Sequence, residues 1–265
     1  MRAKGQTMGT TSTHNINILT FNAHVGICAS SEKLRIMNAW KHFLPSSDKI
    51  RNLDRMAKIL NNFDVVGIQE SDGGSLRSNF VNQTIHLAYV SGFDYCSEKI
   101  NRNLGFARHS IGILSKYPII ATEKYSLPGS IPGRGLLVAS LDVAGSSMTV
   151  AVVHLSLGKK DRVNQAHFIA EVLQRHKERI ILMGDFNCGH DSEEIRIIVE
   201  KTGLHHASAG VPTYPSWKPF QCIDHLFASE NLQVNDARTL GFRFSDHLPL
   251  AAKARIEKTK SDNGA

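Results

Sequence analysis

The chain has 265 residues, of which 42% are hydrophobic and 21% are charged, a composition typical of a globular domain with one large core. No apolar run is long enough to span a membrane, and the N-terminal segment lacks the apolar region of a cleaved signal peptide, so we expect a cytoplasmic protein. The net charge of +7 and the pI near 9.3 favour a polyanionic partner, either nucleic acid or an acidic lipid surface.

A single domain is expected, because no repeat, low-complexity run or linker divides the chain. It covers residues 15–256, and the polar segments 1–14 and 257–265 are expected to be disordered tails. The four cysteines are far apart in sequence and form no C-x-x-C pair, so we interpret them as reduced thiols and not as disulfide partners or zinc ligands. We expect the protein to be a monomer.

Hydrophobic periodicity predicts helices and strands in mixed order. Apolar residues at helical spacing indicate helices at 51–63, 163–177 and 191–200, the last capped by Asp191 with Glu194. Alternating or continuous apolar runs indicate strands at 16–21, 65–69, 110–115, 135–142, 148–154, 180–185, 223–228 and 248–252. The fourth and fifth of these form a hairpin that turns at 144–146. Crossovers and hairpins together predict a mixed α/β domain in layers, not a purely parallel sheet.

The residues that could carry chemistry recur where predicted strands end. They are Asn22, Glu70, His154, Asp185 with Asn187, Asp224, and Asp246 with His247. Any one of them could close a turn, but their recurrence at six places in one domain favours a metal-dependent hydrolytic site over structural use.

The stretch 180–187, IILMGDFN, runs from a buried strand into an acid and an amide. If the chain stays extended through Phe186, the side chains of Asp185 and Asn187 leave the same face, where both could contact one substrate group, and Phe186 points into the core. The alternative is an Asx turn that closes the strand.

Other strand ends also have two interpretations. Glu70 follows a near-continuous apolar strand, so its carboxylate must be solvated, paired or bound to an ion, although it could also cap the next turn. Oxygen donors such as Glu70, Asn22 and Asp246 suit Mg²⁺ or Mn²⁺ better than zinc. His154 is either part of the site or a satisfied core histidine.

Two further features carry alternatives. Asp224 and the Asp246–His247 pair each combine a carboxylate with an imidazole, which suits general acid or base work but is also an ordinary structural contact. Lys159 and Lys160 are predicted to lie in the loop after the strand at 148–154, where they either grip a phosphate or are solvated.

In this order the motifs FNAH, GIQES, HLSLG, GDFNCG, IDHLF and SDHLPL resemble those of the endonuclease/exonuclease/phosphatase superfamily, in its deoxyribonuclease I-like and exonuclease III-like branches. The resemblance extends over nearly the whole predicted domain. It implies a four-layer sandwich of two mixed β-sheets flanked by helices, and Mg²⁺-dependent hydrolysis of a phosphate ester, with Mn²⁺ as an alternative ion. The superfamily includes nucleases, sphingomyelinases and inositol polyphosphate phosphatases.

The resemblance also implies a role for each matching residue. Glu70 corresponds to the principal metal ligand, with Asn22 and Asp246 nearby. Asp185 and Asn187 correspond to the residues that hold the attacking water and the scissile phosphate. His247, oriented by Asp224, corresponds to the general base or a transition-state contact, and His154 to an acid or a donor to a phosphate oxygen. The sequence leaves open which residue activates water.

The chain departs from the better-known branches of this superfamily. His109 and Ser110 stand near the position where exonuclease III relatives tend to have a tyrosine, and the glycine-lysine-glycine run of the inositol phosphatases is absent. We treat His109 as a candidate substrate-binding residue. Arg134, in SIPGRG, either contacts a phosphate or is solvated in its loop.

Two aromatic stretches bear on the substrate. Trp40, Phe43 and Leu44 could insert into a lipid surface, and Trp217 beside Lys218 could stack on a base, unless these stretches pack onto the core. We expect a nuclease first, and an enzyme acting on an acidic phospholipid, a phosphoinositide or another small phosphoester as the alternative. A third hypothesis is a non-catalytic binding module, against which the retention of all six motifs argues.

Overall fold

The computed structural model describes residues 13–176 and 179–257. In this part of the chain the α-helices are α1 (Glu32–Met37), α2 (Ser47–Leu60), α3 (Gln83–Ser91), α4 (Lys159–Leu173) and α5 (Glu193–Thr202). Short 3₁₀ helices are η1 (His24–Gly26), η2 (Ala39–His42) and η3 (Leu76–Ser78). The strands are β1 (Thr13–Asn22), β2 (Val65–Asp72), β3 (Tyr95–Asn103), β4 (Arg108–Ser115), β5 (Ile119–Ser126), β6 (Gly135–Val143), β7 (Ser146–His154), β8 (Arg179–Asp185), β9 (His205–His206), β10 (Asp224–Ala228), β11 (Gln233–Thr239) and β12 (Leu250–Glu257).

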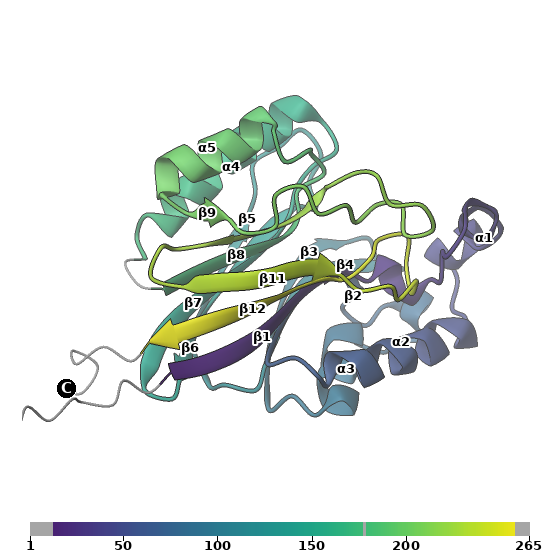
Figure 1. Ribbon diagram of the computed structural model, residues 1–265. Coiled ribbons are helices and arrows are strands. Elements are labelled where there is room, and N and C mark those ends of the chain that lie inside the picture. Colours follow the sequence, from purple (N-terminus) through teal and green to yellow (C-terminus); the bar gives the residue numbers. More distant parts are fainter. Residues whose placement is uncertain (1–12, 177–178, 258–265) are drawn as a thin grey trace, which may run out of the picture.

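Two six-stranded mixed sheets pack face to face between layers of helices (Figure 1). The first sheet has the order β11-β12-β1-β2-β4-β3, and the second has the order β5-β6-β7-β8-β10-β9. One apolar core fills the space between the sheets, a second lies between the second sheet and α4 with α5, and a third lies between the first sheet and α2 with α3. The predicted four-layer α/β sandwich is therefore confirmed.

Most predicted elements are present, with shifted ends. The three predicted helices correspond to α2, α4 and α5, and the predicted hairpin is β6–β7, with Ala144 and Gly145 at positive φ in its turn. The side chain of Ser192 accepts the hydrogen bond that caps α5, so the expected cap at Asp191 is one residue too early. Lys159 and Lys160 begin α4 and do not lie in a loop.

The predicted tails lie mostly outside the described residues. β1 begins at Thr13, two residues inside the segment assigned to the N-terminal tail, and β12 ends at Glu257. Lys177, the predicted end of the helix at 163–177, is likewise outside the described residues. Among the described helices, none combines the length and apolarity needed to cross a membrane.

The strand pairing explains why residues far apart in sequence meet at one edge of the sandwich. β7 and β8 are parallel, so both deliver their last residues, His154 and Asp185, to the same edge, where the two are in register. β10 is antiparallel to β8, so its first residue, Asp224, lies opposite Asp185. Asp224 therefore begins a strand and does not end one, and Asp246 and His247 likewise precede β12.

Candidate active site

Asp185 lies at the centre of the polar cluster at this edge. Its side chain is almost fully buried, and its Oδ2 accepts a hydrogen bond of 3.0 Å from Asn22 Nδ2. The Nε2 atoms of His154 and His247 lie 3.5 Å and 3.9 Å from the same oxygen. Strand alternation places His154 and Asp185 on the inner face of their sheet, because Val152 and Met183, two positions earlier, belong to the core between the sheets. The fold thus brings together four predicted site residues.

Glu70 reaches the cluster through a β-bulge. The pairing of β2 with β4 shifts register between Ile68 and Ser71, and Glu70 has a left-handed backbone with φ of 53°. Ile68 packs on the α2–α3 side, so regular alternation would point Glu70 to that side as well. The bulge instead brings Glu70 Oε1 to 3.7 Å from His154 Nε2. Glu70 is therefore a bulge residue within β2, not the end of a strand as its sequence position predicts.

The chain after Asp185 turns instead of staying extended. Asn187 has φ of 53°, its backbone N–H donates to Asp185 Oδ1 at 2.9 Å, and its amide Nδ2 donates to the Leu155 carbonyl at 2.9 Å. The expectation of an extended pair was wrong, because Asp185 forms an Asx turn with one oxygen and faces the cluster with the other. Phe186 is fully buried in the core, as predicted.

His247 pairs with Asp224 and not with the adjacent Asp246. Its Nδ1 lies 2.8 Å from Asp224 Oδ2, an oxygen that also accepts a hydrogen bond from the Thr213 hydroxyl. Asp246 instead lies 3.6 Å from His24 Nδ1. The Asp224 carboxylate therefore fixes the orientation of the His247 ring, with Nε2 directed toward Asp185.

The pKa values of His247 and Asp185 are both raised, for different reasons. Burial lowers the pKa of His247, but Asp224, Asp185 and Asp246 outweigh it and raise the pKa to about 10. Burial raises the pKa of Asp185, an effect that His247 and the Asn22 amide only partly offset. Near neutral pH, His247 is therefore a cation, and Asp185 holds a proton more readily than an exposed carboxyl group does.

The pKa values of Glu70 and His154, in contrast, are both lowered. Burial opposes ionisation of Glu70, but His154, His24 and His247, with a hydrogen bond from Asn22, together lower its pKa to about 2. Burial, followed by the charge of Arg134, lowers the pKa of His154 to about 3. At neutral pH the carboxylate is ionised and the imidazole is neutral.

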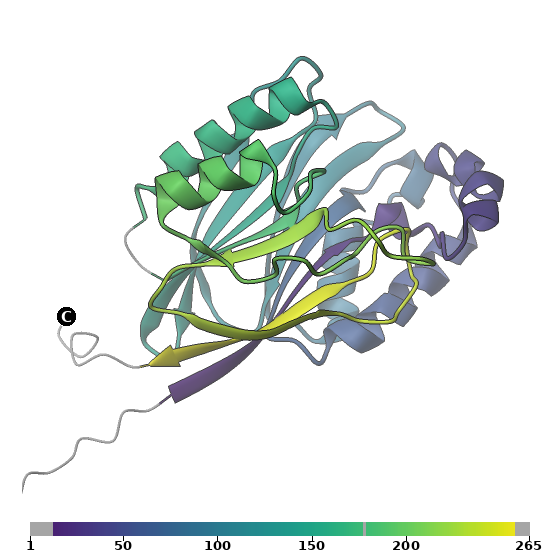
Figure 2. The same ribbon diagram turned by 45° about the horizontal axis from the view of Figure 1, so that its top comes forward.

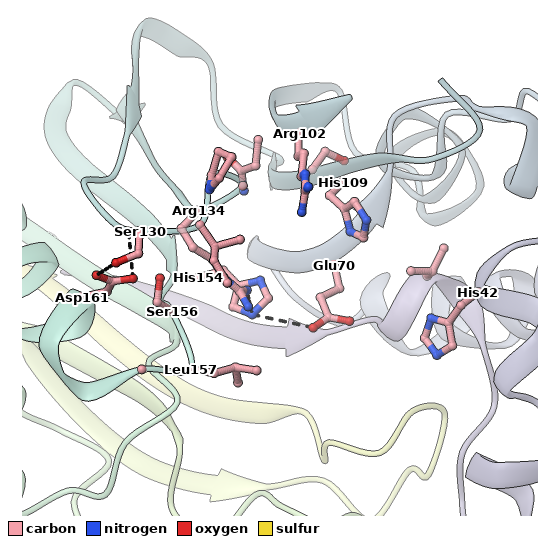
Figure 3. A pocket seen from close by; sticks show the side chains of 17 residues that line it. His42, Glu70, Arg102, His109, Ser130, Arg134, His154, Ser156, Leu157 and Asp161 are labelled. Carbon is pink, nitrogen blue, oxygen red and sulfur yellow. Dashed lines mark hydrogen bonds and ion pairs between the residues drawn. The ribbon is translucent and has the colours of Figure 1, made fainter. Parts of the chain in front are cut away.

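A cavity of about 400 Å³ opens beside Glu70 and His154 (Figure 3). Arg134 lies against the His154 ring, and Arg102, His109 and His42 line other parts of the wall. Burial, then the charge of Arg77, lowers the pKa of His109. The predicted residues Arg134 and His109 thus both line the cavity. The guanidinium groups of Arg134 and Arg102 suit an anionic ligand there.

Sequence reasoning missed several residues of this site. His42 and Arg102 line the cavity, and His24 contacts both Asp246 and the His42 ring, whose centre is 4.7 Å away. A signal existed for His24, which belongs to the FNAH motif, but not for the other two, because tertiary packing alone brings η2 and the end of β3 to the cavity. Trp217 is half-buried with the Arg35 guanidinium 5.9 Å above its ring, which covers the face proposed for stacking.

Two groups of side chains could hold a metal ion. Glu70, His154 and Asp185 have ligand atoms within 4.8 Å of one another, as do Asp185, Asp224 and His247. The first group fits a hard divalent cation, because it contains two carboxylates, one of them half-exposed to the cavity and ionised. Asn22 joins the two carboxylates by donating to Asp185 and Glu70. Asp246 belongs to neither group among the described side chains.

The family model described as "Endonuclease/Exonuclease/phosphatase family" matches residues 19–247. The chain belongs to this family. Members of the endonuclease/exonuclease/phosphatase family are hydrolases that act on phosphoester bonds. The match contains all of the predicted site residues and extends from β1 to His247. No curated protein sequence matches the chain.

Solved structures of the endonuclease/exonuclease/phosphatase family share this fold. A family protein from Bacteroides thetaiotaomicron has 16% identity and a TM-score of 0.72, over 93% of this chain and 100% of that one. A mannosyl-6-phosphatase from the same organism has 17% identity and a TM-score of 0.68, over 90% and 99%. The human Nocturnin catalytic domain, with a bound sulfate anion, has 15% identity and a TM-score of 0.70, over 94% and 97%. At these identities the likeness establishes the fold and not the substrate.

Proposed function

We propose that this family member is a Mg²⁺-dependent phosphoesterase that hydrolyses a phosphoester on a compact polar group held in the cavity beside Glu70. The observation that carries the proposal is the placement of an ionised carboxylate, Glu70, between the Asp185–His247 pair and a cavity lined by Arg134, Arg102 and His109. The Glu70 and Asp185 carboxylates suit a metal ion, and the Arg134 and Arg102 guanidinium groups suit a phosphate group.

Glu70 is the proposed principal ligand of the ion, and Asp185 and Asn22 lie next to it. Asp246 contacts His24 and is farther along the site. Bound Mg²⁺ would act as a Lewis acid that stabilises negative charge on the phosphate oxygens. Mn²⁺ has the same ligand preferences and is the alternative ion. His154 is less suited to this role, because the ring nitrogen that faces the carboxylates also contacts Arg134.

Asp185 is the proposed acceptor for the proton of the attacking water. Its raised pKa makes it a better base than an exposed carboxylate, and Asn22 and His247 hold it in place. The attack forms a bond between the water oxygen and phosphorus, the bond from phosphorus to the leaving oxygen breaks, and one water proton passes to Asp185. The His247 cation stabilises the charge that develops on the phosphate. Asn187 holds the turn that positions Asp185.

His154 and Arg134 are proposed to bind phosphate oxygens at the cavity side. With a pKa of about 3, His154 is neutral in the free protein, which favours a contact to the phosphate over the role of general acid. His109 and Arg102 would contact the group that carries the phosphate, because they line the cavity from β4 and β3 of the first sheet, whereas His154 and Asp185 lie on the second sheet (Figure 3).

The cavity favours a small phosphoester over nucleic acid, the partner that the net charge and the resemblance placed first. About 400 Å³ holds a polar group of sugar or headgroup size. Trp217, the residue considered for base stacking, has one ring face covered by Arg35. Both observations support a substrate whose scissile phosphate is carried by one compact group.

The test is an assay of phosphate or alcohol release with Mg²⁺, Mn²⁺ or excess chelator. Small soluble phosphomonoesters and phosphodiesters are compared with duplex DNA, single-stranded DNA and RNA. We expect turnover of a small phosphoester that needs the cation and falls by a factor of about 10²–10³ in Glu70→Gln, which keeps the shape but loses the charge. Ile120→Ser, an exposed change on β5, is the matched control. Faster hydrolysis of a nucleic acid, or turnover in Glu70→Gln at the wild-type rate, would refute the proposal.

A further inference from the structure

The segment between β1 and α2 exposes a row of large apolar side chains. Ile36, Met37, Trp40, Phe43 and Leu44 are between 50% and 68% exposed. They recur at intervals of one or three residues through α1, η2 and the turn that follows, so they lie close together along this short segment. None of the residues of α1 is buried. This arrangement reverses the usual one, in which the apolar side of a helix faces the core.

A second loop extends this apolar surface. Phe106, in the turn between β3 and β4, is 39% exposed, and its ring centre lies 6.1 Å from that of Phe43. The buried ammonium of Lys49 donates to the Leu44 carbonyl at 3.1 Å and to the Arg77 carbonyl at 2.8 Å, and Arg77 N–H donates to the Phe106 carbonyl. We call Ile36, Met37, Trp40, Phe43, Leu44 and Phe106 the apolar rim. Patches of this kind mark interaction sites.

The charges around the apolar rim are mostly positive. Residues 33–47 and 99–109 contain no aspartate or glutamate, and the acids at their ends are Glu32, Asp48, which pairs with Lys41, and Glu98. The same two segments contain the exposed bases Lys33, Arg35, Arg102 and Arg108. Apolar side chains flanked by an excess of bases are typical of surfaces that bind anionic bilayers.

The apolar rim lies at the cavity. His42 comes from η2, between Trp40 and Phe43, and lines the cavity across from Arg102, which belongs to the other basic segment (Figure 3). Figures 1 and 2 show α1 standing out from the body of the sandwich beyond α2, on the side away from α4 and α5. A surface that meets the apolar rim is therefore next to the cavity that receives the phosphoester.

We infer that the apolar rim docks on the surface of an anionic bilayer, and that the phosphoester is the headgroup of a lipid in that bilayer. The inference rests on the proposed function for the reaction but makes a separate claim about binding. Insertion of Trp40 and Phe43 supplies apolar contact, the flanking bases supply attraction to the lipid phosphates, and His42 and Arg102 receive the headgroup.

Fluorescence tests the insertion directly. The chain has two tryptophans, so Trp217→Phe leaves Trp40 as the only one. We expect its emission to shift to shorter wavelength when vesicles of equimolar phosphatidylcholine and phosphatidylglycerol are added, because the indole leaves water. Vesicles of phosphatidylcholine alone should give a smaller shift, and added salt should reduce the shift with anionic vesicles. An emission unchanged by anionic vesicles would overturn the inference.

Sedimentation with the same vesicles tests the surface as a whole. We expect the full chain to sediment with anionic vesicles and the double variant Trp40→Ser/Phe43→Ser to bind at least about tenfold more weakly, since two large apolar groups no longer leave water. Ile120→Ser removes an equally exposed apolar side chain from β5 and should bind as the wild type does. Circular dichroism shows whether each variant is folded. A double variant that binds as tightly as the wild type would overturn the inference.

Two further measurements separate this inference from its rivals. Glu70→Gln should bind vesicles as the wild type does, because docking does not need the reaction. A wild-type protein that binds vesicles but hydrolyses no phosphoester would refute the proposed function and leave docking intact. A protein that hydrolyses a soluble phosphoester but ignores vesicles would do the reverse. Sedimentation velocity tests a second copy of the chain as the occupant: a dimer that Trp40→Ser/Phe43→Ser disperses, without vesicle binding, would overturn the inference.

Discussion

Arg77 and Asp72 form a buried ion pair two residues after the bulge that carries Glu70. Their side chains are 2% and 0% exposed, and Arg77 Nε donates to Asp72 Oδ2 at 2.5 Å. Burial opposes ionisation of Asp72, but the hydrogen bonds from Arg77 and Ser75, with the Arg77 charge, lower its pKa. Arg77→Met keeps much of the side-chain volume and removes the charge, so the buried Asp72 carboxylate loses its ion-pair partner and keeps only the electrostatic interaction with the buried Lys49.

The expected cost follows from the contacts that Asp72 keeps. Removing one partner of a buried pair destabilises a protein by about 3–5 kcal/mol. Asp72 still accepts hydrogen bonds from the backbone of Gly74 and Ser75 and from the hydroxyls of Ser75 and Ser78, so we expect the lower end, about 3 kcal/mol. For a chain of this length that loss corresponds to a fall in Tm of roughly 6–12 °C. The double variant Asp72→Asn/Arg77→Met, which removes both charges of the pair, should recover part of the loss.

Thermal and urea unfolding, followed by circular dichroism, measure these differences. Arg51→Met is the control, because Arg51 pairs with Asp48 at the surface, where the two side chains are 72% and 52% exposed. Such a pair contributes at most about 1 kcal/mol. If Arg77→Met and Arg51→Met shift the unfolding midpoint equally, or if the double variant is less stable than Arg77→Met, the interpretation of this pair as a buried, mutually dependent unit is wrong.

Four further predictions concern pH, the site and its backbone. Because the pKa of Asp72 is lower in the folded than in the unfolded state, its ionisation stabilises the fold fully above the unfolded pKa of about 3.9, and this stabilisation is lost as pH falls through the folded pKa. The free energy of unfolding of Asp72→Asn should therefore be lower at neutral pH and depend less on pH during acid unfolding. Asp224→Asn removes the largest charge that raises the pKa of His247, so NMR titration should find that pKa lowered, with activity reduced about 10²–10⁴-fold; an unchanged pKa would contradict the pairing. A Cβ at Gly184, which has φ of 146°, would lie 2.1 Å from a carbonyl oxygen of β7, so Gly184→Ala should lose several kcal/mol of stability while Gly158→Ala, in open space, changes it by less than about 1 kcal/mol. Chelation should abolish turnover without unfolding the domain, and Mg²⁺ should restore it; activity in excess chelator would count against a metal ion.

The parts of the fold that the sequence predicted are those with the strongest periodicity. The continuous apolar runs that became β2 and β8 lie buried on both faces, so their hydrophobicity is visible in any window. The strand β5, IIATEKYS, is an exposed edge strand with polar residues at most positions, and the helix α3, QTIHLAYVS, turns Tyr89 outward, so neither has a clean pattern. Their form is decided by the neighbours they pair with or pack against.

The candidate site divides in the same way. Its members could be named, because a polar residue at the end of an apolar run is conspicuous, but residue spacing alone did not show their partners. The family resemblance implied that Asp224 orients His247, and the structure has this contact across 23 positions. The neighbouring Asp246 faces His24 instead, because these contacts depend on strand pairing. The left-handed conformation of Glu70 has no signature in a residue of this type, whereas asparagine, as at position 187, adopts this conformation more often. The direction of each side chain depends on it.

His154, Asp185 and Asp224 stand on one rung of the second sheet, in register across three hydrogen-bonded strands. Neighbouring strands are about 4.8 Å apart, and changing that spacing would break the ladder on both sides of β8. These three residues therefore cannot spread or close around different substrates, and the energy needed to reorganise them during a reaction is small. Any adjustment to the size of the substrate falls to the loops at the cavity, such as the one that carries His42.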